Sequence, residues 1–173
     1  MLKYYKKSIF ILLISFITSN CGFHSIYNDK IINDSNISLN AIKISQNKDK
    51  NEQRLRIELE KALNPEHIKI KKKYILDFDI KKQTQIIIIN KTGASGKNRI
   101  TLNVKYKLKD MEYGDVISSG SVYAKDTYDV QNNRFANYIA EEEVERGLLR
   151  SISQNIRDFL IRDLNKYEGQ QED

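Results

Sequence analysis

The sequence predicts an α+β fold, a two-layer sandwich with two helices packed on one face of a four-stranded, mostly antiparallel sheet, in the order β-α-β-β-β-α. Two segments alternate apolar and polar side chains with a period of two, which is typical of strands with one buried and one solvated face. Two other segments repeat apolar residues at helical spacing. With 173 residues, of which 40% are hydrophobic, the chain can fill one core but not two.

Residues 1–20 predict a cleaved export signal. A lysine-rich start precedes an apolar run of 11 residues, Ser8–Thr18, which is about half the length that a membrane-spanning helix needs. Cys21, the only cysteine, follows Asn20 directly. We expect a lipoprotein signal peptidase to cut before Cys21, which then carries fatty acyl groups such as palmitate and anchors the chain. Gly22 in place of aspartate favours transfer to the outer membrane.

Two other interpretations of this start compete with a lipoprotein signal. Asn20 is larger and more polar than the small residue usual before a lipidated cysteine, so the segment could be an ordinary secretory signal with an incidental cysteine. It could also be an uncleaved anchor. The shortness of the apolar run favours the lipoprotein.

Composition excludes several kinds of protein. Removing the three lysines of the export segment from the 29 basic residues leaves 26 against 23 acidic ones, a net charge of +3 in place of +6. That charge is too small to predict nucleic-acid binding. A single cysteine allows no intrachain disulfide and no cysteine-based metal site. No cofactor or metal is predicted.

Residues 21–35 are polar and irregular, and they predict a tether that leads into the fold. The folded domain is expected over residues 36–166, and residues 167–173 are expected to form a frayed tail. The first element is predicted as a strand over Ile37–Ser45. Its apolar residues change phase, which suggests a bulge or a strand buried on both faces.

The segment Lys50–Leu63 predicts a helix. Asp49 can cap it, and Glu52 stands three residues later as the reciprocal partner of a capping box. Asn64-Pro65 should end it, because the residue before proline avoids helical backbone angles. Its apolar stripe consists of Leu55, Leu59, Ala62 and Leu63.

Three strands are predicted next, over Ile68–Lys81, Arg99–Lys109 and Val116–Thr127. Between the first two lie the isoleucine-rich residues 85–90 and then Lys91–Asn98, whose two glycines predict a flexible loop. In the second strand, one face is expected to be buried and consists of Ile100, Leu102, Val104, Tyr106 and Leu108.

The last element is predicted as a long helix over about Ala136–Asn165. Glu141–Glu143 should lie near its N-terminus, where the helix dipole favours carboxylates. Its buried stripe is expected to be Val144, Leu148, Leu149, Ile152, Ile156, Phe159, Leu160 and Leu164.

The sequence offers little for catalysis and predicts a protein that is not an enzyme. His24 and His67 are the only histidines, and both are expected at the surface. Thr92–Lys97 superficially resembles a phosphate-binding loop, but it joins two predicted strands, whereas such a loop must lead into a helix. Asp77 and Asp79 are expected to be solvated partners of neighbouring lysines.

Basic residues form the candidate binding site. Two rows of lysines could lie on the solvated face of the sheet, namely Lys69, Lys71, Lys73, Lys105, Lys107 and Lys109. A second cluster in and beside the predicted loop comprises Lys91, Lys97 and Arg99. These rows either make the face soluble and protect strand edges, or they bind an anionic partner such as a lipid phosphate.

Three stretches resemble the LPS-assembly lipoproteins of the LptE type. Cys21–Tyr27 (CGFHSIY) is similar to the Cys-Gly-Phe-x-x-x-Tyr start of that family, although His24-Ser25 stands where Arg-Pro is common. Glu52–Leu59 resembles the family's first helix, and Asn133–Leu160 its second. The order of the elements also agrees.

The resemblance implies a role without catalysis. Family members plug the lumen of the large LptD β-barrel of the outer membrane, assist its assembly, and take part in inserting lipopolysaccharide into the outer leaflet. The implied location is the periplasmic side of the outer membrane. Candidate lipopolysaccharide-binding residues, chosen from charge alone, are Lys71, Lys73, Lys105, Lys107, Lys91, Lys97 and Arg99. The alternative is a lipoprotein that serves another barrel-assembly or secretion complex, and a hydrolase is the third class.

Overall fold

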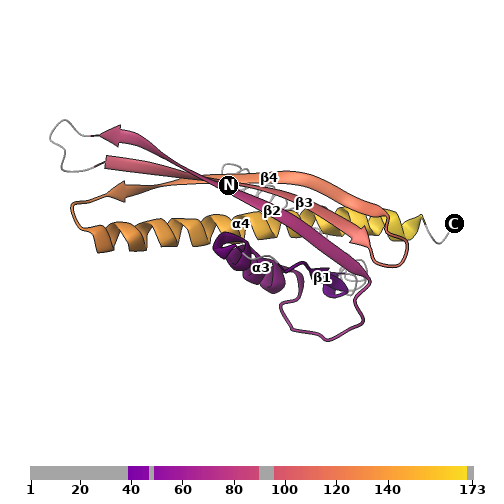
Figure 1. Ribbon diagram of the computed structural model, residues 1–173. Coiled ribbons are helices and arrows are strands. Elements are labelled where there is room, and N and C mark those ends of the chain that lie inside the picture. The colour runs from indigo at the N-terminus through magenta and orange to yellow at the C-terminus, as the bar shows by residue number, and fades with distance from the viewer. Residues whose placement is uncertain (1–38, 47–48, 90–95, 171–173) are drawn as a thin grey trace, which may run out of the picture. The chain divides into compact units, whose positions relative to one another are not determined.

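The computed structural model describes residues 39–46, 49–89 and 96–170, and it has the predicted α+β fold (Figure 1). The element order β-α-β-β-β-α is confirmed, with bounds β1 Ile42–Ile44, α3 Lys50–Leu63, β2 Tyr74–Ile89, β3 Gly96–Asp110, β4 Val116–Val130 and α4 Arg134–Gly169. The four strands lie in sequence order in one sheet. β1 runs parallel to β2, and the two other pairs are antiparallel.

The core lies between the sheet and the two helices. On β3, the five residues expected to be buried are all at most 6% exposed, so the predicted alternation is confirmed. α4 packs mainly on β4 and, to a smaller extent, on β3, while α3 packs beside α4. α4 contributes six apolar side chains to the core, namely Leu148, Leu149, Ile152, Ile156, Leu160 and Leu164.

Helix α3 begins and ends where its sequence predicts. The Asp49 carboxylate accepts the N–H of Asn51 at 2.9 Å, so it caps the helix through Asn51 and not through Glu52. After the helix, the Asn64 side chain accepts the N–H of Ile68 and donates to its carbonyl. These two hydrogen bonds close the turn around Pro65, which leads toward β2.

Polar contacts fasten α4 to the sheet at intervals along its length. The Ser118 hydroxyl on β4 donates to Asp163 at 2.6 Å, and the Tyr74 hydroxyl on β2 donates to Glu168 at 2.9 Å. Burial and then the Glu168 carboxylate raise the pKa of Tyr74 well above its usual range, so this hydroxyl stays a donor. These contacts hold the C-terminal half of α4 in a fixed register on the sheet.

A buried carboxylate joins three elements in the other half of α4. Glu145 is 4% exposed, and the Lys82 ammonium on β2 lies 2.8 Å from both Glu145 and Glu141. Arg54 on α3 approaches the second oxygen of Glu145 at 3.6 Å and bonds to Glu142 at 2.6 Å. Because a buried carboxylate is costly without cations, this ion cluster ties α3, α4 and β2 together.

Two strand boundaries differ from the prediction for the same reason. The segment 68–73 alternates like a strand, but β3 ends at Asp110 opposite Tyr74, so no partner strand lies beside residues 68–73 and β2 begins at Tyr74. At the other end, the isoleucine run continues β2 to Ile89, and Gly96–Asn98, predicted as loop, pair with it in β3. A strand therefore extends only as far as its neighbour does.

The first strand and the final helix also need correction. Of Ile37–Ser45 only Ile42–Ile44 form β1, because Leu39 and Asn40 are helical, which explains the change of apolar phase. α4 extends to Gly169, so the start of the expected frayed tail is helical. Phe159 is 36% exposed and outside the buried stripe.

Glu141–Glu143 lie farther from the start of α4 than the sequence predicts. The helix begins at Arg134 and its first turn contains no acidic residue; Asn133 caps it by accepting the N–H groups of Phe135 and Ala136. Glu141 and Glu142 form ion pairs with β2 and α3 instead of interacting with the helix dipole.

The ion cluster predicts the effect of replacing Lys82. Lys82→Met should lower the free energy of unfolding by about 2 kcal/mol, because Glu145 keeps only the more distant Arg54. Lys81→Met, the matched control, removes an exposed neighbour on the opposite face and should change stability by at most about 0.5 kcal/mol. Urea unfolding of both variants measures this, and equal effects would contradict the assignment.

The stability difference between the wild type and Lys82→Met should also depend on pH. Burial lowers the pKa of Lys82, but the hydrogen bonds from Lys82 to Glu141 and Glu145 outweigh burial and raise it above 10.5. The contribution of Lys82 to stability is therefore complete below pH 10.5 and is lost as the pH rises through its folded-state pKa. The stability difference between the wild type and Lys82→Met should therefore narrow as the pH rises through that alkaline range.

Candidate functional site

The candidate site is the face of the sheet that α3 and α4 leave uncovered among the described residues, and we call it the outer face. Residues of β3 that alternate with the buried ones point to this face, and the strand register places their partners on β2 and β4 beside them. Its basic side chains are Lys81, Lys97, Arg99, Lys105, Lys107, Lys109 and Lys125, and its carboxylates are Asp77, Asp79 and Asp129. The outer face is therefore basic overall.

Lys105 and Lys107 stand at the middle of the outer face. In the register, Lys107 lies opposite Asp77 and Lys105 opposite Asp79. The Asp77 carboxylate, however, pairs with Lys109, at 3.0 Å. Neither Lys105 nor Lys107 forms an ion pair with any part of the chain that the structure describes. Both exposed ammonium groups are thus available to an external anion.

Lys97 and Arg99 lie farther along β3, toward the end of the β2–β3 hairpin. Lys97 pairs with Asp129 of β4 at 3.5 Å, and both side chains are largely exposed. The hairpin carries large apolar side chains at the same end, since Ile86 is 69% and Ile87 is 38% exposed. A bulge interrupts the register between Ile86 and Ile88. Ile86 lies opposite Asn98, so its side chain is on the face toward the helices, whereas Lys97 and Arg99 are on the outer face. Cations and exposed hydrocarbon therefore occur at the same end of the sheet, on its two faces.

The start of α4 lies at this same end of the domain, because Gly96 pairs with Val130 just before the helix begins. Phe135, Tyr138 and Ile139 are 72%, 54% and 43% exposed. Their spacing of i, i+3 and i+4 places them on one side of the helix. We call these three residues with Ile86, Ile87, Lys97 and Arg99 the hairpin end. Exposed apolar groups gathered in this way are typical of a contact surface.

Of the two predicted rows of lysines, only the one on β3 lies in the sheet. Lys69, Lys71 and Lys73 are exposed but precede β2, so they form no row beside Lys105 and Lys107, and the prediction of two facing rows is wrong. The interaction of Asp77 with a neighbouring lysine is confirmed. Cys21 and Lys91 lie outside the described residues, and so does His24.

Three residues of the outer face were missed as site candidates. Lys81, Lys125 and Tyr123 project to it, and Tyr123 is 67% exposed opposite Asn103. Period-two alternation along the sequence identifies the face of each strand, but the register between strands decides which side chains meet. An exposed aromatic ring at mid-strand was the one available signal.

Features elsewhere in the described chain bear on other kinds of site. His67, predicted at the surface, is exposed in the turn after α3, with a positive φ of 53°. Within residues 39–46, 49–89 and 96–170, no helix is long and apolar enough to cross a bilayer, and no group of three or more His, Cys, Asp or Glu side chains could hold a metal ion.

Comparisons with known proteins support the fold. No protein-family model matches the sequence, and a comparison with curated proteins finds no match. Among solved structures, a protein of Caulobacter crescentus assigned as a lipoprotein matches with a TM-score of 0.60 and 16% identity over 75% of this chain and 95% of that one. A minor lipoprotein of Acinetobacter baumannii matches with a TM-score of 0.52 and 15% identity, over 70% and 89%.

At these identities the likeness concerns the fold alone. The matches cover 95% and 89% of the two neighbours and 75% and 70% of this chain, so the two-layer domain corresponds to nearly the whole structure of each neighbour. The chain therefore has the fold of these two bacterial proteins.

Proposed function

We propose that the chain is a lipid-anchored protein without catalytic activity, held on the periplasmic side of the outer membrane, that plugs an LptD-type β-barrel and takes part in lipopolysaccharide insertion. The observation that carries this proposal is the uncovered basic outer face next to an apolar hairpin end. This combination suits an amphiphile with phosphate groups and acyl chains.

The lipid anchor rests on the sequence and agrees with the fold. The cysteine at position 21 directly follows the apolar segment, as in a lipoprotein signal. The two structural neighbours named above, which share the fold, are described as lipoproteins. The Cys-Gly-Phe start points in the same direction.

The absence of catalysis is proposed from how the titratable groups are used. Lys82, Tyr74 and Asp163 have displaced pKa values, and each bonds across the boundary between α4 and the sheet. Catalytic groups with displaced pKa values usually face a substrate. Lys82 and Asp163 each line a surface hollow, but their charged atoms already bond to Glu145 and Ser118. Here the displaced groups hold the two layers together.

Contact with lipopolysaccharide would use both parts of the site. Ammonium groups at Lys105 and Lys107, with Lys97 and Arg99 farther along β3, can bind phosphates, because such point charges tolerate variable geometry. Ile86 at the hairpin end offers hydrocarbon for acyl chains. A plug inside a barrel also needs a folded domain of its own, which the packed core provides.

The barrel partner can be tested directly. The lipidated chain, purified from detergent-solubilised outer membranes, should bring with it a large LptD-type barrel in a stoichiometric complex. The control is a chain with Cys21→Ser, which should lose the membrane fraction and the barrel together. Recovery of a different assembly or secretion complex would favour the alternative function, and a clean monomer would contradict both.

Lipopolysaccharide binding can be tested by reversing charge at the outer face. Lys105→Glu with Lys107→Glu should weaken binding to lipopolysaccharide by about tenfold or more, because both ammonium groups lack partners within the described chain. The control, Arg162→Glu with Lys166→Glu, makes the same change of net charge on exposed positions of α4. An affinity that stays the same in both variants would mean that the outer face serves solubility only.

A further inference from the structure

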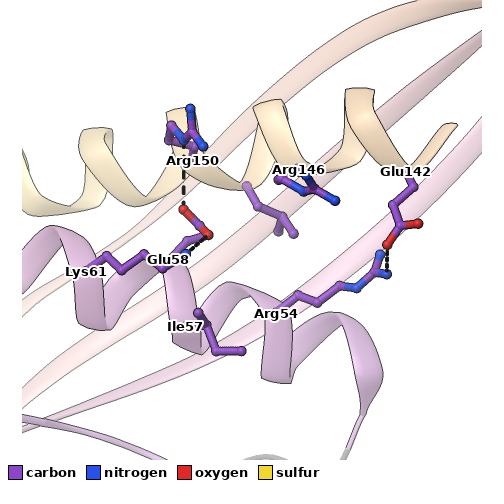
Figure 2. Close-up of a pocket in the computed structure, with 8 residues that line it drawn as sticks. Arg54, Ile57, Glu58, Lys61, Glu142, Arg146 and Arg150 are labelled. Atoms are coloured by element: carbon purple, nitrogen blue, oxygen red, sulfur yellow. Dashed lines mark hydrogen bonds and ion pairs between the residues drawn. The ribbon is translucent and has the colours of Figure 1, made fainter. Parts of the chain in front are cut away.

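A hollow between α3 and α4 lies outside the site described above. It has a volume of about 450 Å³, and α3 supplies one of its walls and α4 the other. Figure 2 shows basic side chains of both helices lining it, with Arg54 and Lys61 from α3 and Arg146 and Arg150 from α4. We call it the interhelical groove.

Two short ion pairs occupy the acidic side chains of the groove. Arg54 bonds to Glu142 at 2.6 Å, and Lys61 bonds to Glu58 at 2.7 Å. Arg150 approaches Glu58 only at 4.0 Å, and its side chain is 65% exposed. In Figure 2, no interaction reaches the guanidinium of Arg146.

Arg146 and Arg150 are therefore the cations of the groove that can bind a further anion. No hydrogen bond or ion pair links Arg146 to the described residues, and Arg150 has one contact at the limit of an ion pair. The two residues are one helical turn apart, about 6 Å along α4. A second hollow of about 360 Å³ shares Glu58, Lys61 and Arg150 and continues the groove along α4 to Gln154 and Arg157.

Apolar side chains lie between the charges. Leu149 is 2% exposed and forms part of the lining, while Ile57 of α3 is 45% exposed. A bound partner would therefore meet accessible hydrocarbon at Ile57 on the α3 wall and guanidinium groups along the α4 wall.

We propose that the interhelical groove docks an acidic amphipathic helix of a partner protein. The basic positions repeat at helical spacing on both walls, as i and i+7 on α3 and i, i+4 and i+11 on α4. A third helix laid along the groove would present carboxylates at i and i+4 to Arg146 and Arg150 and apolar residues to Ile57 and Leu149.

The arrangement favours a helix over a phosphate-rich lipid surface. Glu58 and Glu142 lie among the basic side chains, and they would repel a dense layer of phosphates. Two carboxylates one helical turn apart match the spacing of Arg146 and Arg150, whereas Glu142 and Glu58 already pair with Arg54 and Lys61. The proposal does not depend on the outer face, because the groove belongs to the helical layer.

The test uses a fluorescein-labelled helical peptide of about 18 residues with glutamates at i, i+4 and i+11 between leucines, and fluorescence anisotropy with the full chain. The wild type should bind it, and Arg146→Gln with Arg150→Gln should weaken binding about tenfold or more. The matched control, Arg162→Gln with Lys166→Gln, removes two cations at the same spacing outside the groove and should bind like the wild type.

A second variant separates docking from general charge effects. Ile57→Asn removes the exposed apolar side chain of α3 without changing the charge of the groove and should also weaken binding, while far-ultraviolet circular dichroism confirms that the variant is folded. Equal binding of a peptide with glutamine in place of glutamate would overturn the proposal. Equal loss in the control variant would overturn it as well. So would displacement of the peptide by phosphatidylglycerol vesicles that bind through Arg146 and Arg150.

Discussion

The packing of α4 on one face of the sheet is the constraint on which the rest of the structure depends. Its buried stripe packs on β4 and β3, and α3 packs beside it over β1 and β2, so the two helices together cover one face of the sheet within the chain itself. Replacing a single fully buried leucine of such a stripe by alanine typically costs about 2–5 kcal/mol. The other face then needs no covering helix, and it can carry lysines, arginines and an exposed tyrosine without loss of core.

Much of the fold follows from local pattern, and the errors follow from what a local pattern omits. The helix Lys50–Leu63 and the buried face of β3 agree with expectation, because apolar period and capping residues act within a few residues of each other. The segment 68–73 alternates equally well but has no neighbouring strand, and the isoleucines to Ile89 form strand because Gly96–Asn98 pair with them. Pairing between strands is a property of the whole sheet, so a single strand's sequence does not contain it.

The candidate site shows the same division. Charge and alternation were enough to select Lys105 and Lys107, whereas the register was needed to add Tyr123 and Lys125 and to exclude Lys69–Lys73 from the sheet. The buried Glu145 and its cations were also missed, because a glutamate one turn after Glu141 on a helix gives no sign of burial in the sequence. Contacts between α3, α4 and β2 create that site. The two surfaces that remain open, the outer face and the interhelical groove, lie on different layers and can serve different partners.

We propose that the chain is exported and fastened to a membrane through its lone cysteine, so that the domain acts as a binding partner. Mass spectrometry of the protein isolated from cell membranes tests it most directly. We expect a mature chain that begins at Cys21 and carries diacylglyceryl and amide-linked acyl groups on that residue. An unmodified protein in the soluble fraction that still carries residues 1–20 would contradict it.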